Sequence, residues 1–367
     1  MTTTPPSESW TSLAYSMMRV FVNWQRERRL NKVRERKQAA RTANGLLAAG
    51  GGGARGQSLV IRVDGSIACW GLNNLGQAPP DGVPGDFVAI ATDETHSLAL
   101  RVDGSIACWG DNTFDQAPPA GVPGDFVAIA AGGGHSLAIR VDGSIACWGD
   151  NDEGQALPDG VPGTFVAIAA GAIHSLALRV DGSIACWGHN GDGRAPPDGI
   201  PGNFVAIAAG ARHSLALRVD GSIACWGHNE DGQDPPDGVP GTFVAIAAGA
   251  IHSLALRVDG SIACWGDNDV GQAPPDGVPG TFVAIATGAR HSLALRVDGS
   301  VECWGDNDVG QAPPDGVPGT FVAIAAGARH SLALRVDGSV ACWGYNGDDQ
   351  APPAGVSGPF RVTQADL

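Results

Sequence analysis

The sequence predicts an all-β protein whose main domain is a β-propeller of eight 39-residue repeats, with seven blades as the alternative. The triplet Cys-Trp-Gly occurs eight times, always 39 residues apart, from Cys69 to Cys342. Each repeat contains short runs that alternate small and large residues, separated by Gly and Pro at fixed places. A period near 40 residues with several short strands and no helix is typical of propeller blades.

The repeat that begins at His252 shows the elements of one unit in order. Two alternating runs flank Asp-Gly, which is a strong local signal for a two-residue hairpin loop. A segment rich in Gly, Pro and Asn follows, and a third strand closes the unit. The expected elements are a strand at 253–258, a turn at 259–260, a strand at 261–266, a connection at 267–281 and a strand at 282–286.

A two-residue loop determines which residues face each other across this hairpin. It pairs Leu254 with Trp265 and His252 with Asp267. Large residues, including Leu254 and Trp265, then share one face of the sheet, and small ones, including Ser253, share the other. Blades of this kind bury both faces only by stacking in a closed ring.

The chain begins and ends out of phase with the repeat. The first unit starts at its hairpin, residues 57–71, and no Phe-Val-Ala-Ile strand precedes it. Residues 360–363 align with that missing strand, so we expect them to pair with the hairpin of residues 58–70 and close the ring. The expected organisation is a basic amphipathic segment at 1–43, helical or disordered, a flexible Gly-rich linker at 44–56 and the propeller at 57–367.

Charge is divided unevenly along the chain. Residues 1–56 carry a net charge of +7 and residues 57–367 a net charge of −22, which together give −15. An acidic body repels phosphate backbones, so no nucleic acid is expected on the propeller.

The N-terminal segment has its own pattern. Residues 10–24 place large apolar side chains on one helical stripe, and a basic run at 26–41 follows. This pattern allows an interfacial helix on anionic lipid, nucleic-acid contact by the basic half, a docking helix, a disordered tail or an over-extended start. No apolar stretch of 18 residues occurs, and Arg19 interrupts the only apolar run that resembles a signal peptide. We expect a cytoplasmic protein, with residues 10–41 as its candidate contact with a membrane surface.

The eight cysteines occupy one equivalent position in each repeat. Equivalent atoms of neighbouring blades lie about 10 Å apart, beyond the ~7 Å that a disulfide tolerates. We therefore expect eight free, buried thiols, which favours a reducing compartment. No cofactor or metal is expected.

Seven repeats carry His at one equivalent position, and this regularity favours an architectural role. A weaker alternative is a general base, in which His96 pairs with Asp111 and three other units repeat the pair. No Ser or Cys nucleophile varies alongside these pairs, so we expect no enzyme activity. The alternative zinc ligands are His174 with His189 and His213 with His228, with Asp192 or Asp231 nearby.

The pattern GxxHSLAL…DGS(I/V)…WGxNxxGQ resembles the repeat of the regulator-of-chromosome-condensation propellers over residues 57–367. The short unit, with VPG before FVAIAAG, is most similar to the bacterial β-lactamase-inhibitory propellers of that superfamily. Two features differ from the family. Its members usually have seven blades, and the inserted wedge that eukaryotic members use on their GTPase is absent, because every unit has the same length.

The repeats differ from one another at two places, the residue before His and the loop after Trp-Gly. Both places lie at the end of the hairpin opposite Asp-Gly, so they emerge on one face of the ring. Neutral drift of exposed loops is one explanation, but the exposed connection stays close to APPDGVPG in most units. We therefore interpret this face as a recognition surface. The predicted partner-binding residues are Phe114, Ile173, His189, Arg212, His228, Ile251, Arg290, Arg329 and Tyr345.

The sequence thus predicts a non-enzymatic propeller that binds another protein through its varied loops. The family resemblance implies two alternatives. One is an inhibitor that caps an enzyme such as a β-lactamase, and the other is a guanine-nucleotide exchange factor for a small GTPase.

Overall fold

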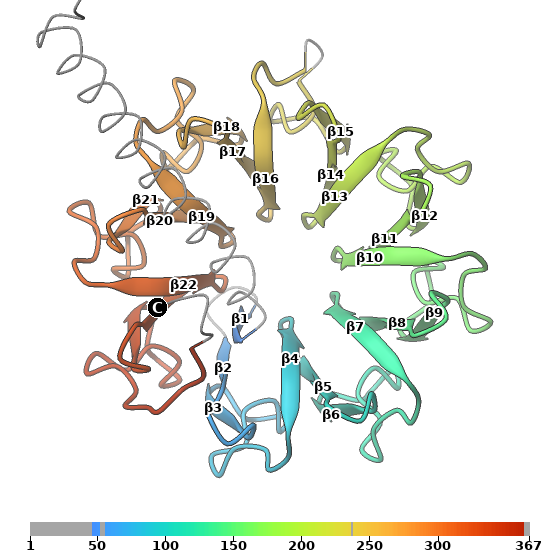
Figure 1. Cartoon of the computed structure of the whole chain (residues 1–367), viewed down its shortest axis with the longest axis horizontal. Helices are drawn as coiled ribbons and strands as arrows, with labels where there is room; N and C mark the ends of the chain where they lie inside the picture. Colours follow the sequence, from blue (N-terminus) through green and yellow to red (C-terminus); the bar gives the residue numbers. More distant parts are fainter. Residues whose placement is uncertain (1–45, 52–55, 236–237, 363–367) are drawn as a thin grey trace, which may run out of the picture.

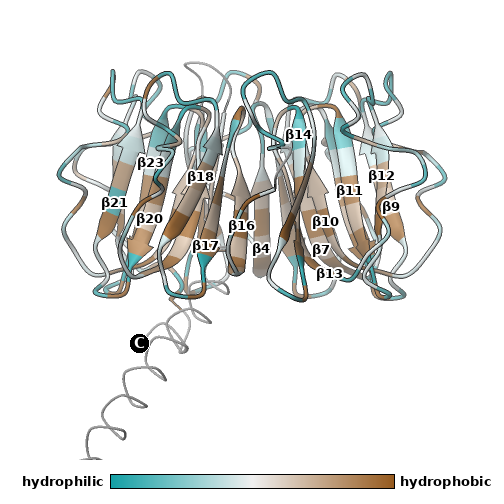
Figure 2. Ribbon diagram, turned by 90° about the horizontal axis from the view of Figure 1, so that it is seen from above, coloured by the Kyte–Doolittle hydropathy of each residue, from teal (hydrophilic) through white to brown (hydrophobic). Residues whose placement is uncertain are grey.

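The computed structural model describes residues 46–51, 56–235 and 238–362. They form eight antiparallel sheets of three strands each, which stand around a central axis like the blades of a propeller (Figure 1). The strands run between the two faces of the disc (Figure 2). The all-β fold with eight blades is confirmed, and the seven-blade alternative is wrong. The segment expected at residues 1–43 lies outside the described residues.

Each blade has an inner strand beside the axis, a middle strand and an outer strand, in this order along the chain. Blade 1 contains β1–β3, and the numbering follows the chain to blade 8, β22–β24. The inner strands are β1 (Leu47–Gly50), β4 (Phe87–Thr92), β7 (Phe126–Ala131), β10 (Phe165–Ala170), β13 (Phe204–Ala209), β16 (Phe243–Ala248), β19 (Phe282–Thr287) and β22 (Phe321–Ala326). The middle strands are β2 (Gln57–Ile61), β5 (His96–Arg101), β8 (His135–Arg140), β11 (His174–Arg179), β14 (His213–Arg218), β17 (His252–Arg257), β20 (His291–Arg296) and β23 (His330–Arg335). The outer strands are β3 (Ile67–Gly71), β6 (Ile106–Gly110), β9 (Ile145–Gly149), β12 (Ile184–Gly188), β15 (Ile223–Gly227), β18 (Ile262–Gly266), β21 (Val301–Gly305) and β24 (Val340–Gly344). Nowhere in the described part of the chain does a helix reach the length and hydropathy of a membrane span.

The loop between the middle and outer strands has three residues, one more than the sequence predicts. In blade 6, Arg257 donates its backbone N–H to the carbonyl of Ser261 at 2.8 Å, so the loop is Val258–Gly260. The Asp259 carboxylate accepts hydrogen bonds from the backbone N–H and the hydroxyl of Ser261, at 2.9 and 2.7 Å. Gly260 follows Asp259 with a φ of +94°. An Asp side chain that bonds two residues ahead, followed by Gly at positive φ, stabilises this longer loop.

The longer loop shifts the hairpin register by one residue and corrects the predicted faces. Leu254 lies opposite Cys264, and Ser253 lies opposite Trp265. Leu254 and Cys264 pack with Phe282 in the interface with blade 7. Trp265 lies on the other face, in the interface with blade 5. This is the expected effect of a one-residue slip, because side chains alternate between the two faces of a strand.

Polar side chains join neighbouring blades by a chain of hydrogen bonds. Between blades 3 and 4, His135 Nε2 lies 2.9 Å from Ser175 Oγ, and the Ser175 hydroxyl donates to the carbonyl of Gln155 at 3.0 Å. The Trp187 indole N–H donates to the same carbonyl at 2.9 Å. Because Ser175 uses its hydrogen on the carbonyl, the hydrogen of His135 lies on Nε2. The His–Ser contact recurs at seven junctions, at 2.8–3.0 Å, so the architectural role of these histidines is confirmed.

Both ends of the described chain complete blade 1. Strand β1 pairs along its whole length with β2. Beyond the N-terminal end of β1, Phe360 forms a bridge with Arg62, and Arg361 donates its backbone N–H to the carbonyl of Ile61 at 2.9 Å. Phe360 therefore takes the position of the Phe that opens each of the other inner strands, and β1 supplies the remainder.

This arrangement corrects two expectations. Residues 360–363 do not form the whole missing strand, because only Phe360 and Arg361 pair with the first hairpin and Thr363 lies outside the described residues. The flexible linker expected at 44–56 instead contains β1, so the propeller begins before residue 57. Leu-Ala-Ala-Gly provides the same small apolar residues as the inner strands of the other blades, but the glycines that follow it conceal this similarity.

Candidate functional site

The propeller has two different faces. The constant face carries the Asp-Gly loops, and the varied face carries the residue before each His and the first residue after each Trp-Gly. These two variable positions are neighbours across every hairpin: His189 donates its backbone N–H to the carbonyl of Ile173, and Tyr345 to that of Arg329, both at 2.9 Å. In blade 8 the Arg329 guanidinium also lies over the Tyr345 ring, 5.8 Å from its centroid. The register predicted from a two-residue loop did not place these two variable positions opposite each other.

The nine predicted partner-binding residues all belong to the varied face, but their accessibility differs. Phe114 is 51% exposed, and the side chains of Arg212 and Arg290 are 55% and 45% exposed. The His228 side chain is only 11% exposed. The partly exposed members are Ile173, His189, Ile251, Arg329 and Tyr345.

Asp192 is the centre of a charged group on blades 4 and 5. It forms an ion pair with Arg194, and its Oδ2 atom lies 3.9 Å from Arg212 Nη2 and 3.7 Å from His228 Nδ1. Arg194 is 2% exposed and stands where the other units carry Gln. These neighbouring charges and the hydrogen bond from Arg194 lower the pKa of Asp192, although desolvation by burial acts in the opposite direction.

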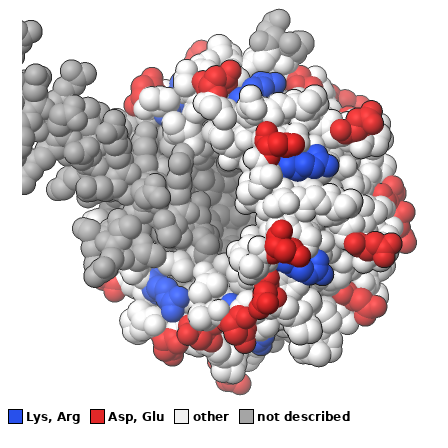
Figure 3. All heavy atoms as spheres, turned by 45° about the vertical axis from the view of Figure 1, so that its right-hand side comes forward, with Lys and Arg blue, Asp and Glu red and all other residues white. Residues whose placement is uncertain are grey.

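Two further contacts connect adjacent blades at the rim. His189 Nδ1 lies 2.9 Å from Glu153 Oε2, and Arg290 Nη2 lies 4.0 Å from Asp267 Oδ2. The space-filling view shows acidic side chains distributed around the visible surface, with arginines beside several of them (Figure 3). Variable charges on this face are therefore partly paired with one another and partly free to contact a partner.

The histidines of the His–Ser contacts are unsuited to proton transfer with a bound molecule. They are buried, and burial is the main cause that lowers their pKa to about 3 or 4 in His135, His174, His213, His252, His291 and His330. The register places His96 opposite Gly110 instead of Asp111. The predicted His–Asp general base is therefore wrong.

The zinc alternative fails for the same reason. His174 and His213 lie opposite glycines in their hairpins, and their Nε2 atoms contact Ser214 and Ser253. Within residues 46–51, 56–235 and 238–362, no three His, Cys, Asp or Glu side chains are grouped as metal ligands.

All eight cysteines are free thiols, as expected from their spacing. Burial raises the pKa of every one to about 12. At neutral pH they are protonated thiols, so they pack as small apolar side chains and are weak nucleophiles.

The constant face carries exposed valines that the sequence reasoning missed. They occupy two positions of the repeat, the second residue of the inner strand and the residue before Asp-Gly. The exposed members are Val63, Val88, Val102, Val127, Val141, Val166, Val180, Val205, Val219 and Val258. The sequence indicated the exposed valines of the hairpin loops, because a Val precedes Asp-Gly in every hairpin and no partner strand covers a side chain at that position.

The repeats match a known family. Six segments match the model described as Regulator of chromosome condensation (RCC1) repeat, at residues 126–155, 165–194, 204–233, 243–272, 282–311 and 321–350. Each segment spans an inner strand, the following hairpin and the loop that ends at Gln or Arg194. The chain is an RCC1-repeat propeller. This confirms the family resemblance, whereas the similarity to the β-lactamase-inhibitory members stays a prediction.

Solved structures show the same fold for the RCC1-repeat propeller. The CRINKLY WD40 ectodomain of the Arabidopsis thaliana receptor kinase ACR4 is 24% identical, with a TM-score of 0.55, over 75% of this chain and 98% of that one. The ectodomain of the Physcomitrella patens receptor kinase CR4 is 25% identical, with a TM-score of 0.55, over 71% and 73%. Prp20p from Saccharomyces cerevisiae is 21% identical, with a TM-score of 0.56, over 68% and 82%. No match is found among curated proteins.

Proposed function

We propose that this RCC1-repeat propeller is a non-enzymatic protein-binding ring that recognises its partner with the varied face. One observation carries the proposal. The two variable positions pair across every hairpin, so the differences between repeats are gathered on one face. The invariant Ser and Trp side chains, and the His side chains of seven units, form contacts between blades and are needed for the ring itself.

The chemistry of the exposed residues supports the varied face over the constant face. Arg and Tyr are over-represented in the residues that dominate protein interfaces, and Arg212, Arg290 and Tyr345 lie on the varied face. The constant face offers small valines repeated around the ring, which give a partner no preferred orientation. A partner on the varied face meets a different set of side chains at each blade.

One structural neighbour supports the same class of function. The structure of Prp20p is described together with its binding to Gsp1p and histones. That activity belongs to Prp20p, and it supports only the general proposal that this ring binds protein.

The proposal is tested by capturing partners with the full chain, identifying them by mass spectrometry and titrating the purified partner. We expect alanine at Arg212, Arg290 or Tyr345 to weaken binding tenfold or more without changing the melting temperature. Arg140→Ala is the matched control, because Arg140 is an exposed arginine on the constant face. Binding that depends on Arg140 or on Val219, and not on the varied face, overturns the proposal.

The identity of the captured partner decides between the narrower alternatives. A captured β-lactamase or other enzyme that loses activity in the complex supports the inhibitor, and a small GTPase whose nucleotide exchange accelerates supports the exchange factor. The equal length of all eight units leaves no inserted wedge, which disfavours exchange by the route of the eukaryotic relatives.

A further inference from the structure

The central channel opens on the varied face into a cavity of about 480 Å³. The segments that join inner to middle strands line this mouth, and in six blades they contribute Ala, Gly and one Thr, as in Ala170-Gly171-Ala172. Blade 1 contributes Ala49, Gly50 and Gly51. Blade 2 differs, because it contributes Thr92, Asp93 and Glu94. Among the described lining residues, Asp93 and Glu94 carry the only charges.

The Asp93 carboxylate is anchored by one oxygen only. Its Oδ1 atom accepts the backbone N–H groups of Thr95 at 2.9 Å and His96 at 3.0 Å, and it lies 3.0 Å from His96 Nδ1. The side chain is 9% exposed, and within the described part of the chain Oδ2 is buried without a hydrogen-bond partner. A buried carboxylate oxygen without a donor is costly, so this atom requires a donor.

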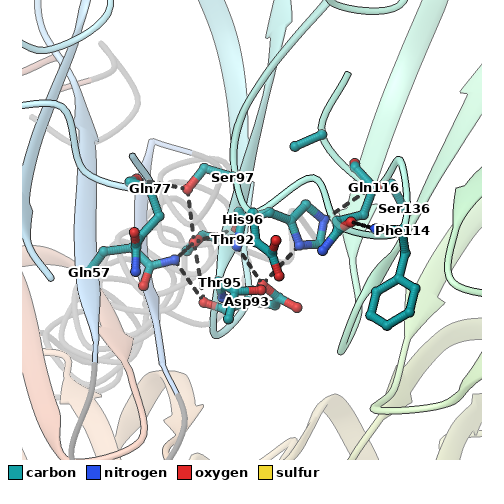
Figure 4. A network of polar contacts seen from close by, with 12 residues as sticks. Gln57, Gln77, Thr92, Asp93, Thr95, His96, Ser97, Phe114, Gln116 and Ser136 are labelled. Atoms are coloured by element: carbon teal, nitrogen blue, oxygen red, sulfur yellow. Dashed lines mark hydrogen bonds and ion pairs between the residues drawn. The ribbon is translucent and has the colours of Figure 1, made fainter. Parts of the chain in front are cut away.

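A second acceptor without a donor belongs to the same network. Gln57 stands where the other seven units carry His, and it is fully buried. Its Nε2 donates to Thr92 Oγ1 at 2.7 Å and to the carbonyl of Asp93 at 2.9 Å (Figure 4). Its Oε1 has no hydrogen-bond partner among the described residues. Gln57 is therefore hydrogen-bonded to Thr92 and to Asp93. Among the described residues, Gln57 Oε1 and Asp93 Oδ2 are both buried oxygens without a donor.

Glu94 adds a second carboxylate at the rim of the cavity. The residue is exposed at the surface, but desolvation of its carboxylate by neighbouring groups, together with the negative charge of Asp93, raises its pKa. The cavity therefore offers acceptors and negative charge and lacks a cation of its own among the described lining residues. It is complementary to a small cationic donor.

We propose that Asp93, with Glu94, binds a single primary ammonium group of a polypeptide, either a lysine side chain or an amino terminus. The inference rests on the proposed function, since it names the anchor that a partner places in the channel mouth. An ammonium group fits better than a guanidinium group. A guanidinium ion gains most from bidentate binding to both oxygens of a carboxylate, but Oδ1 of Asp93 is already occupied by two backbone N–H groups.

The test uses blocked peptides as probes, so it does not require the natural partner. The lysine probe is N-acetyl-Gly-Lys-Gly-amide, the amino-terminal probe is Gly-Gly-Gly-amide, and the guanidinium probe is N-acetyl-Gly-Arg-Gly-amide. Each is titrated into the full chain at low salt and followed by NMR or calorimetry. We expect one or both ammonium probes to bind at least fivefold more tightly than the guanidinium probe, and the stronger of the two identifies the source of the ammonium group.

Asp93→Gly is the decisive variant, because Gly occupies the equivalent position in the other seven blades and the ring tolerates it there. At the equivalent Gly171, a Cβ atom added to the glycine would lie only 2.2 Å from His174 Cε1, so Gly suits the packing of the His ring. We expect Asp93→Gly and the isosteric Asp93→Asn to weaken the ammonium probe tenfold or more. Asp111→Asn, on the varied face outside the cavity, is the matched control and keeps full affinity.

Two results overturn the inference: equal affinity of the ammonium probe for wild type and Asp93→Gly, or guanidinium binding as tight as ammonium binding. These results leave the recognition face standing if alanine at Arg212 or Tyr345 still weakens the partner. Conversely, ammonium binding that depends on Asp93 is retained if the partner contacts the constant face, and only the proposed function then fails.

Discussion

His330 Nε2 lies 3.0 Å from the hydroxyl oxygen of Ser58, which precedes it by 272 residues. The same contact joins His135 to Ser175 and the other neighbouring blades, so the two ends of the ring meet through the ordinary junction. Ser58 also donates to the carbonyl of Gln350 at 3.0 Å, as the serines of other junctions do to theirs. The ring therefore closes by repetition of one interface. The junction between blades 1 and 2 differs, because Gln57 replaces the histidine there.

The first prediction concerns this repeated contact. His252→Ala should lower the free energy of unfolding by about 2–4 kcal/mol, because it leaves a cavity and a Ser292 hydroxyl without its donor. His189→Ala removes a partly exposed histidine and should change stability by less than about 0.5 kcal/mol. Thermal unfolding followed by circular dichroism measures both variants. Equal melting temperatures for the two would contradict a structural role of the contact.

The second prediction concerns acid stability. The unfolded pKa of histidine is about 6.5, and burial lowers the folded value to about 4 in His135 and His330 and to about 3 in His252 and His291. The unfolded chain therefore binds more protons between these values. The free energy of unfolding that depends on these neutral, buried histidines is fully present above about pH 6.5. It is lost as the pH falls towards 4, because the unfolded chain takes up protons that the folded ring does not.

The size of this effect is large, because one pKa unit at each of six buried histidines already amounts to about 8 kcal/mol. We expect urea unfolding to become steeply easier between pH 6.5 and 4.5, with an uptake of several protons per molecule. Six aspartates of the Asp-Gly loops titrate lower, since hydrogen bonds from Ser lower the pKa of Asp64, Asp103, Asp142, Asp181, Asp220 and Asp337. A midpoint that is the same at pH 7 and pH 5 would rule out the histidine mechanism.

The third prediction concerns ring closure. Phe360 is 3% exposed and packs in the core shared by blades 1 and 8, so Phe360→Ala should cost about 3–5 kcal/mol. Phe114→Ala is the same substitution at a side chain that is 51% exposed, and it should leave the unfolding midpoint unchanged. Chemical denaturation compares the two. If Phe360→Ala unfolds like Phe114→Ala, the C-terminal residues do not close blade 1.

The fourth prediction concerns the thiols. Burial raises the pKa of the eight cysteines to about 12, including the partly exposed Cys225. At pH 8 a thiol reagent should therefore label the folded protein slowly, and all eight thiols should react after unfolding without a reductant. Cys225 should be the first to react in the folded state. Fewer than eight reactive thiols after unfolding would indicate a disulfide.

Several features of the fold were predictable because they depend on local residue types. The spacing of Cys-Trp-Gly predicted eight blades, and the constant Asp-Gly loops with varied positions opposite them predicted two different faces. The register was not predictable from Asp-Gly alone. This dipeptide permits loops of two or three residues, and the hydrogen bonds from Ser261 to Asp259 select the longer one.

Other features depend on contacts between distant residues. Strand β1 was missed because Leu47–Gly50 lacks the Phe that opens other inner strands, and that Phe is supplied by residue 360. The replacement of His by Gln57 was visible in the sequence. Its meaning was not, because only the closed ring places Gln57 beside Thr92 and Asp93.

The last prediction concerns Arg194, the one departure from Gln in the loop after Trp-Gly. In blade 2, Gln116 Oε1 accepts the backbone N–H of Phe114 at 2.8 Å and holds the loop closed. Arg194 has no acceptor to replace this bond, and its Nε atom is buried without a partner in the described structure. Loss of one partner of a buried ion pair destabilises a protein when the other charge stays buried, but the Asp192 side chain is 31% exposed and stays in contact with water when Arg194 is removed. Gln also restores the loop bond, which is worth about 1 kcal/mol.

Arg194→Gln should therefore stabilise the ring by about 1 kcal/mol, and the reverse change, Gln155→Arg, should destabilise blade 3 by at least as much. Urea unfolding measures both. The variant also releases Asp192 from its buried ion pair and leaves it with Arg212 and His228, so partner affinity should change if this charged group takes part in recognition. A loss of stability in Arg194→Gln would show that the ion pair with Asp192 outweighs the missing loop bond. In that case the departure from Gln is a stabilising element of blade 4, because the attraction between Arg194 and Asp192 then exceeds the cost of burying the charge.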